Sequence, residues 1–345
     1  MDHEIKTNRR AFLRTAALGV VAAEFVLLMP SLALSQEQAI GLGPLKMVKA
    51  GVLDVAYHES GSADGIPVVL LHGFPFDPHA YAEVAPMLAA RGCRVIVPYL
   101  RGFGATRFLD AATPRSGQQT ALGADLLALL DALSIPRAVL AGYDWGGRAA
   151  CAVAALSPER CHALVSVNGY ALLDLSRMNI PVPPERELPA WYQFYFLTER
   201  GKAGYTRYRR ETNKLLWKLW SPQWHFDDAT FERTAPAFDN PDYIEVTIHS
   251  YRHRYNQVAG DPAYAELDRR LAALPVITVP TITLDGANDA VVLPTDGLSY
   301  ANKFPARKAH RIVPGAGHNL PQEAPLTFAQ AVLELLPVKV QSAFR

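Results

Sequence analysis

The sequence predicts an α/β fold in which helices cover both faces of a mostly parallel sheet and a group of helices is inserted within the chain. Short apolar segments alternate with helical patterns through the first half of the chain, as in the right-handed β-α-β units of parallel sheets. These segments are continuously apolar, as strands covered on both faces require. The alternation stops at about residue 172 and resumes at about residue 280. We therefore expect one α/β domain interrupted by a helical insertion.

The order of the elements follows from these patterns. The segments LKMVKAG and LDVAYHESG predict two strands joined by a tight turn at Gly51. Further strands are expected within residues 66–73, 93–100, 138–144, 161–169, 280–289 and 308–318. Helices are expected at about residues 79–91, 118–133, 145–156, 295–303 and 322–336, and several more in the aromatic-rich insertion. The basic segments SYRHRY and RYRRE of the insertion are interpreted as solvated helices.

The composition is that of an ordinary globular protein. Half of the 345 residues are hydrophobic and the formal net charge is +1, so no net basic field would attract nucleic acid. The three cysteines, Cys93, Cys151 and Cys161, lack metal-ligand spacing and do not form a disulfide framework. We expect them to be buried as small apolar residues, although the sequence leaves open whether Cys151 and Cys161 pair.

The first 35 residues are different in kind. Arg9 and Arg10 precede an apolar run and then small residues, which is the order of a secretory signal peptide. The paired arginines resemble the twin-arginine export signal of bacteria. Cleavage near Ala33–Ser35 and location in the periplasm or outside the cell are expected. A membrane anchor and an ordinary amphipathic helix are the alternatives, but the apolar run is short for a membrane span, contains Glu24 and ends at Pro30.

Residues 142–146 form the segment that most directly indicates chemistry. Gly-Tyr-Asp-Trp-Gly fits the pattern G-x-nucleophile-x-G, with Asp144 at the turn from a buried strand into a helix. Glycines are needed on both sides because side chains there would clash with the closely packed strand and helix. The amino terminus of that helix favours negative charge, both on a carboxylate and on an oxyanion formed from it.

Candidate catalytic partners for Asp144 follow later in the chain, first an acidic residue and then a base. Asp289 ends the segment LDGAND after a buried strand, and His318 lies in GAGHNLPQEAP. Because the ends of parallel strands meet at one edge of a sheet, we expect these side chains to lie together. HGFP follows an earlier strand, and the N–H groups of Phe74 and Trp145 are predicted to form an oxyanion hole.

Taken together, HGFP, GYDWGG, GAND and GHNLPQEAP resemble the α/β-hydrolase fold, specifically its aspartate-nucleophile branch. That branch includes soluble epoxide hydrolases and the haloalkane and haloacetate dehalogenases. The resemblance covers nearly all of the chain after the signal. It implies a hydrolase core over 36–171 and 274–345 and a helical cap over 172–273, following the signal peptide expected over residues 1–35.

A carboxylate nucleophile suits attack on a saturated carbon. Serine would leave an ether, which water cannot readily cleave, whereas Asp144 would leave an ester. His318 could then activate water to attack the carboxyl carbon of Asp144, with Asp289 orienting the imidazole and stabilising its charged form. The expected mechanism is alkyl transfer followed by ester hydrolysis.

The leaving group distinguishes members of the branch. Epoxide hydrolases use two cap tyrosines as acids, and here WYQFYF supplies Tyr192 and HSYRHRY supplies Tyr251. A phenol is a donor at neutral pH and tolerates apolar surroundings. Epoxide opening to a vicinal diol is therefore the preferred reaction, and Tyr195 and Tyr255 are the nearest competing tyrosines.

Two other functions stay open. Haloalkane dehalogenases hold the halide with the tryptophan after the nucleophile, here Trp145, and a second donor that Trp191 or another cap tryptophan could supply. Haloacetate dehalogenases resemble this chain in HGFP but usually carry arginine at the position of Trp145 to hold a carboxylate; here Arg148 lies one helical turn later. A ligand-binding member without catalysis is the remaining alternative, although it would not need Asp144, Asp289 and His318 together.

The expected partners are a small apolar epoxide or haloalkane, water and the twin-arginine export machinery. Membrane contact is expected only during export, and neither nucleic acid, metal nor organic cofactor is expected.

Overall fold

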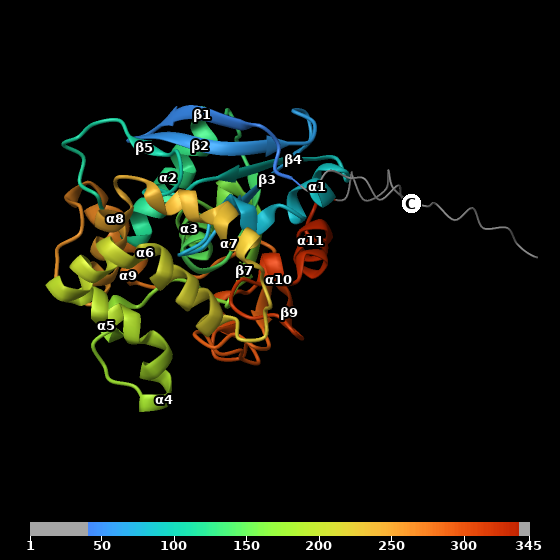
Figure 1. Cartoon of the computed structure of the whole chain (residues 1–345). Coiled ribbons are helices and arrows are strands. Elements are labelled where there is room, and N and C mark those ends of the chain that lie inside the picture. The colour runs from blue at the N-terminus through green and yellow to red at the C-terminus, as the bar shows by residue number, and fades with distance from the viewer. Residues whose placement is uncertain (1–40, 338–345) are drawn as a thin grey trace, which may run out of the picture. The chain divides into compact units, whose positions relative to one another are not determined.

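The computed structural model describes residues 41–337, which contain one nine-stranded sheet (Figure 1). The strand order is β1-β2-β4-β3-β6-β7-β8-β9, with β5 beside β2. The strands are β1 (Leu45–Ala50), β2 (Leu53–Ser60), β3 (Ile66–Leu71), β4 (Cys93–Pro98), β5 (Arg107–Phe108), β6 (Ala138–Gly142), β7 (Cys161–Val167), β8 (Thr281–Gly286) and β9 (Arg307–Val313). The mostly parallel sheet and the α/β class predicted from the sequence are confirmed.

The directions of the strands follow from how they are connected. β1, β2 and β5 are antiparallel to their neighbours, and β1 and β2 form the predicted hairpin, in which Gly51 has a φ of 57°. From β4 to β9 all neighbours are parallel. All residues of β6 and β8 are buried, as expected for strands covered on both faces. The central strands therefore end at one shared edge, where the candidate site lies.

Helices flank this sheet on two sides. α2 (Gln119–Ala132) packs with α3 (Asp144–Leu156), and α1 (Val84–Ala89) packs with α11 (Pro325–Glu334). The two pairs lie on opposite sides of the strands in Figure 1. α3 begins directly after β6 and is rich in glycine and alanine, so it packs closely on the sheet. The short α10 (Leu320–Glu323) precedes α11.

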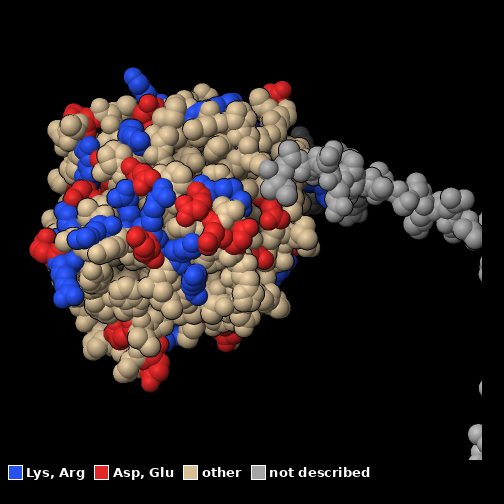
Figure 2. Space-filling model, viewed as in Figure 1, with Lys and Arg blue, Asp and Glu red and all other residues tan. Residues whose placement is uncertain are grey.

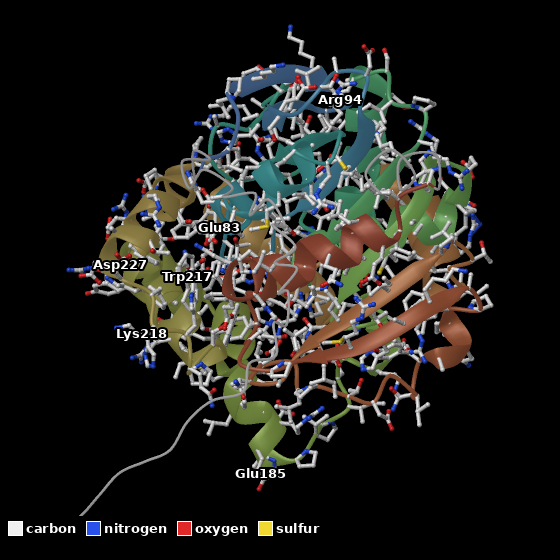
Figure 3. The ribbon with its side chains drawn as sticks, turned by 90° about the vertical axis from the view of Figure 1, so that its right-hand side faces the viewer. Glu83, Arg94, Glu185, Trp217, Lys218 and Asp227 are labelled. Atoms are coloured by element: carbon white, nitrogen blue, oxygen red, sulfur yellow. The ribbon has the colours of Figure 1, made fainter. Side chains whose placement is uncertain are left out.

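A run of helices connects β7 to β8 and carries many of the aromatic residues. Its α-helices are α4 (Pro184–Glu187), α5 (Trp191–Leu197), α6 (Glu199–Trp220), α7 (Asp228–Thr234), α8 (Tyr243–Arg254) and α9 (Ala265–Ala272). Trp217 is buried on the inner side of α6, whereas its neighbour Lys218 lies at the outer edge of the helix (Figure 3). Glu185 of α4 lies away from the sheet in the same view. This alternation of buried and exposed residues indicates that α6 packs one face against the core.

One predicted helix is wrong. Residues 295–303 form turns, and only a short 3-10 helix occurs, at Ala301–Lys303. Gly297 has a φ of 70°, and the side chains of Thr295 and Asp296 accept hydrogen bonds from the N–H groups two residues later. Such local side-chain bonds compete with helical hydrogen bonds, so they form a loop where apolar spacing suggested a helix.

The structure describes the three cysteines but not the first 35 residues. The predicted twin-arginine signal lies outside the described residues. In residues 41–337, no helix has both the length and the apolar character needed to cross a membrane. Cys93, Cys151 and Cys161 are buried free thiols, and the Cys151 sulfur lies 3.4 Å from the hydroxyl of Ser166. The structure therefore answers the open question about Cys151 and Cys161 with two unpaired thiols.

Candidate active site

Asp144 lies at a sharp turn between β6 and α3. It has a φ of 48°, in the left-handed region, although it is not glycine; such strain is characteristic of functional positions. A Cβ atom on Gly146 would lie 2.1 Å from the carbonyl oxygen of Leu71, and one on Gly142 would lie 2.7 Å from the backbone of Gly146. The glycines on both sides are thus required by the close packing of β3, β6 and α3 around this turn.

The loop after β3 supplies a backbone donor to this carboxylate. The N–H of Phe74 donates a hydrogen bond of 2.9 Å to Oδ1 of Asp144, although the two residues are 70 positions apart. Trp145 follows Asp144 in the first turn of α3, where backbone N–H groups lack partners within the helix. The Phe74 and Trp145 rings stack with centroids 5.4 Å apart. The two predicted oxyanion-hole residues therefore lie side by side at Asp144.

His318 faces Asp144 and is held from behind by Asp289. Nδ1 of His318 lies 2.8 Å from Oδ2 of Asp289, and Nε2 lies 3.9 Å from Oδ2 of Asp144. Asp289 also accepts hydrogen bonds from the N–H groups of Val291 and Val292. Burial lowers the pKa of His318, but the adjacent Asp289 carboxylate and the charge of Asp144 outweigh it, so the pKa is raised. The imidazole is thus oriented with Nε2 towards Asp144.

A second hydrogen-bonded group fixes the loop that carries His318. The Ser221 hydroxyl accepts from the His318 N–H at 2.9 Å and donates to Oε1 of Glu323 at 2.6 Å. Glu323 also accepts from the N–H groups of Gly317 and Asn319. Ser221 directly follows α6, so this contact ties the inserted helices to the catalytic loop.

Tyr192 of α5 and Tyr251 of α8 pack together beside Phe74, the residue that donates a hydrogen bond to Asp144. Their ring centroids are 5.5 Å apart, and the Tyr251 ring lies 5.6 Å from that of Phe74. Burial raises the pKa of Tyr192 to about 12, and burial also raises that of Tyr251. The negative charge of Asp144 adds to both shifts. Both phenols therefore stay protonated at neutral pH and can donate a proton.

Asp144 is ionised despite its buried position. Burial alone would raise its pKa, but the charges of Arg148 and His318 and the N–H of Phe74 lower it overall. The closest charged group is Arg148, whose Nη2 lies 3.3 Å from Oδ2. Asp144 thus has the charge that a nucleophile needs.

The competing tyrosines, Tyr255 and Tyr195, make other contacts. The Tyr255 hydroxyl donates to Gln193, and the Tyr195 ring packs against Trp191. Arg101 is buried against Asp125, with a separation of 2.6 Å, and holds loops together. Within residues 41–337, no group of three or more histidine, cysteine or acidic side chains is arranged to hold a metal ion.

The interpretation of the basic segments as solvated helices is correct for one and wrong for the other. On α6, Arg209 and Arg210 lie at the surface and pair with Asp239. Figure 2 shows Lys and Arg interspersed with Asp and Glu on this face. In SYRHRY, however, Arg254 is 4% exposed, because α8 turns that residue inward one helical turn after Tyr251.

Four neighbours of the site were not predicted. Asn168 donates to Asp289 at 3.1 Å, and Gln193 donates to the hydroxyl of Tyr192 at 3.2 Å. Ser221 and Arg254 were also missed. Asn168 follows a predicted strand, and this position at the sheet edge could have revealed it. No sequence signal identifies the others, because their positions depend on how the inserted helices pack.

Comparison with known proteins assigns the fold family. The sequence matches the alpha/beta hydrolase fold family over residues 66–325, and the chain belongs to that family. A Klebsiella pneumoniae structure described as a "putative epoxide hydrolase" is 51% identical, with a TM-score of 0.83, and the match covers 84% of this chain and 96% of that one. Epoxide hydrolase A of Mycobacterium tuberculosis is 26% identical over 307 residues, which are 81% of this chain and 92% of the relative. A mutant of an epoxide hydrolase from Solanum tuberosum is 20% identical, with a TM-score of 0.67 over 84% of this chain and 98% of that one. This last similarity supports the fold alone.

Proposed function

We propose that the protein is an epoxide hydrolase that converts an epoxide to a vicinal diol through an ester with Asp144. The observation that carries the proposal is the pair of buried phenols, Tyr192 and Tyr251, whose rings lie 5.5 Å apart and pack beside Phe74, the backbone donor to Asp144. This arrangement supplies the nucleophile and the acid that ring opening needs. The names of the relatives from Klebsiella pneumoniae and Mycobacterium tuberculosis support the same reaction.

The first step is ring opening. Oδ1 of Asp144 is held by Phe74, whereas Oδ2 faces His318, so Oδ2 is assigned as the attacking atom. It forms a bond to a ring carbon while the bond from that carbon to the epoxide oxygen breaks. A proton from Tyr192 or Tyr251 passes to that oxygen, which leaves a hydroxyl and an alkyl ester.

The second step is hydrolysis of this ester. His318 removes a proton from water through Nε2, and the water oxygen bonds to the carboxyl carbon of Asp144. The N–H of Phe74, together with that of Trp145, stabilises the negative oxygen; one such donor contributes about 3–4 kcal/mol in comparable enzymes. The bond from the carboxyl carbon to Oδ2 then breaks, and the protonated His318 returns its proton to Oδ2, which releases the diol. The second proton of the attacking water restores the tyrosine, and Asp144 is again a carboxylate.

Isotope labelling tests this route. In a single turnover in ¹⁸O-water, the diol should carry no label, because its new hydroxyl oxygen comes from Asp144, and the Asp144 carboxylate should gain one ¹⁸O. Mass spectrometry of the diol and of the peptide containing Asp144 measures both. Labelled diol from the first turnover, with unlabelled Asp144, would contradict the covalent route.

Dehalogenation is a second candidate, supported by two tryptophans. Trp145 and Trp220 are buried, and neither indole Nε1 has a hydrogen-bond partner in the described part of the chain. The Trp220 ring lies 5.0 Å from that of His318, so both indoles border the site and could hold a halide. Assays of styrene oxide and a bromoalkane side by side separate the two reactions. Halide release without diol formation would favour dehalogenation.

The domain boundaries and export are proposed on the sequence pattern. Residues 1–35 act as a twin-arginine signal, residues 36–171 and 274–345 form the hydrolase core, and residues 172–273 form its cap. The order of Arg9, Arg10 and the apolar run supports export to the periplasm or beyond. Cell fractionation of the full chain and of an Arg9→Lys, Arg10→Lys variant tests this, and an unchanged distribution would contradict it.

A further inference from the structure

Gln193 of α5 makes three side-chain hydrogen bonds beside the two acid tyrosines. Its Oε1 accepts from Nη1 of Arg254 at 3.1 Å and from the hydroxyl of Tyr255 at 3.1 Å. Its Nε2 donates to the hydroxyl of Tyr192 at 3.2 Å. Because a guanidinium can only donate, the atom that faces Arg254 must be the amide oxygen. The amide nitrogen of Gln193 therefore faces Tyr192.

This orientation of the amide determines where the hydroxyl proton of Tyr192 can point. An amide nitrogen can only donate, so the Tyr192 oxygen accepts this bond and its own proton points away from Gln193. Among residues 41–337, no acceptor takes that proton. The Tyr192 ring lies 5.0 Å from the Trp220 ring, which in turn lies 5.0 Å from that of His318. Tyr192 therefore packs towards the catalytic residues, and its proton is available to the epoxide oxygen.

Ring opening places a negative charge on the tyrosine that gives up its proton. The bond from Gln193 to Tyr192 then joins an N–H to a phenolate, and hydrogen bonds to charged groups are about twice as strong as neutral ones. Burial raises the pKa of Tyr192 to about 12, and the charge of Arg254 opposes that rise. Arg254 thus favours the phenolate directly, and it also holds the Gln193 amide in the donating orientation.

Tyr251 lacks a comparable donor. The Arg254 guanidinium lies over the face of its ring, 4.5 Å from the centroid, and donates to Gln193. In the described part of the chain, no amide or charged group donates to the Tyr251 hydroxyl. The two phenols therefore differ, because only Tyr192 has a side-chain amide in place to stabilise its charged form.

We propose that Gln193 is a positioning residue for ring opening, whose amide N–H directs the Tyr192 proton to the epoxide oxygen and stabilises the phenolate that remains. This inference rests on the proposed epoxide hydrolysis. The O–H bond of Tyr192 breaks and a new O–H bond forms on the former ring oxygen, while Tyr251 donates a hydrogen bond to that oxygen and keeps its proton. The negative charge thereby passes from Asp144 to Tyr192.

The variant Gln193→Glu separates this role from a structural one. It keeps the shape of the side chain and an acceptor for Arg254 and Tyr255. Its second carboxylate oxygen cannot donate, so the Tyr192 hydroxyl turns to donate to it, away from the substrate. Ester formation from styrene oxide, followed by tryptophan fluorescence in single turnovers, should slow at least about tenfold. Ester hydrolysis should keep its rate, because Gln193 does not contact His318.

Two further variants serve as comparisons. Gln193→Met removes the donor without adding charge and should slow ester formation less than Gln193→Glu does. Gln193 is half-buried and lines an open surface groove, so both variants should fold, which circular dichroism checks. The matched control Gln257→Glu adds the same charge at an exposed glutamine just after α8 and should leave both rates unchanged.

Double variants test whether the effect passes through Tyr192. Adding Gln193→Glu to Tyr192→Phe should slow ester formation no further, because the phenol that Gln193 serves is already absent. Adding it to Tyr251→Phe should slow ester formation by about the full factor. Unchanged ester formation in Gln193→Glu, or the same added loss in both backgrounds, would overturn the inference while leaving epoxide hydrolysis intact. If the unmodified enzyme forms no diol from styrene oxide or 1,2-epoxybutane, the proposed function fails, and this inference fails with it.

Discussion

His318 faces Asp144 at 3.9 Å, from Nε2 to Oδ2, which is too long for a hydrogen bond, while its Nδ1 is held by Asp289 at 2.8 Å. The imidazole is therefore fixed on one side and free on the side of the carboxylate. A base in that position can act on a water that approaches the carboxyl carbon of Asp144. This separation suits the proposed route, in which Asp144 first attacks the substrate and its carboxyl carbon is then attacked by water.

Asp144→Asn should abolish turnover. The amide keeps the shape of the side chain but lacks the charge that attacks the ring carbon, so we expect kcat to fall by at least about 10³-fold. Diol formation from styrene oxide measures the loss, and circular dichroism checks that the variant is folded. Retention of more than a tenth of the activity would show that Asp144 is not the nucleophile.

His318→Gln should trap the ester. Ring opening needs Asp144 and the tyrosines, whereas hydrolysis needs the imidazole, so removal of the base stops the second step only. Intact-protein mass spectrometry should detect one bound substrate per chain, on the peptide that contains Asp144. A variant that neither turns over nor accumulates this adduct would assign His318 a role before ester formation.

The rate of ester hydrolysis should depend on pH through His318. In the free enzyme this pKa is raised by Asp289 and Asp144 despite burial. In the ester Asp144 is neutral, so Asp289 is the catalytic carboxylate that continues to raise it. Only the neutral imidazole accepts a proton, so hydrolysis should slow as the pH falls through this raised pKa. Rapid-mixing experiments that follow decay of the ester from pH 5 to 9 measure the profile.

The variant Asp289→Asn tests whether Asp289 raises the pKa of His318. Asp289 contributes most to raising the pKa of His318, and without it burial dominates and lowers that pKa. The fall in the rate of ester hydrolysis at acid pH should therefore move to lower pH. The maximum rate should fall as well, because the imidazole loses the partner that orients it. If the rate of ester hydrolysis falls at the same pH in this variant, a group other than His318 controls it.

Variants of Tyr192 and Tyr251 test whether these residues protonate the epoxide oxygen. Tyr192→Phe and Tyr251→Phe should each lower kcat for styrene oxide roughly tenfold or more, and the double variant about 10²–10⁴-fold, as expected for loss of general acid catalysis. Because burial raises both pKa values, neither loss should depend on pH between 6 and 9. Tyr195→Phe, in the same helix as Tyr192, is the matched control and should leave kcat unchanged.

The sequence predicted those parts of the site that depend on the sheet. Asp144 and Asp289 follow buried strands, and His318 follows the last strand, so the topology brings them to one edge. The positions of Arg254 and Ser221 depend instead on how α6 and α8 pack. One helical turn decides whether Arg254 faces water or Tyr251, and composition does not encode that choice. The helix predicted over residues 295–303 is wrong for a related reason, because the hydrogen bonds that the side chains of Thr295 and Asp296 accept from the backbone outweighed apolar spacing.

Ser221→Ala should destabilise the loop that carries His318. Ser221 is 1% exposed, and its hydroxyl accepts hydrogen bonds from the N–H groups of His318 and Asn319 and donates one to Glu323. Its removal leaves buried partners unsatisfied, which costs about 1–3 kcal/mol of the free energy of unfolding. Urea denaturation of the variant measures this cost.

A matched serine controls for the substitution itself. Ser176 bonds to Asp174 at the surface, and Ser176→Ala should change the free energy of unfolding by no more than about 0.5 kcal/mol. Ser221→Ala should also lower kcat, because a looser His318 loop misplaces the base, while ester formation by Asp144 keeps its rate. Equal effects of the two variants on unfolding would show that Ser221 does not join the inserted helices to the catalytic loop.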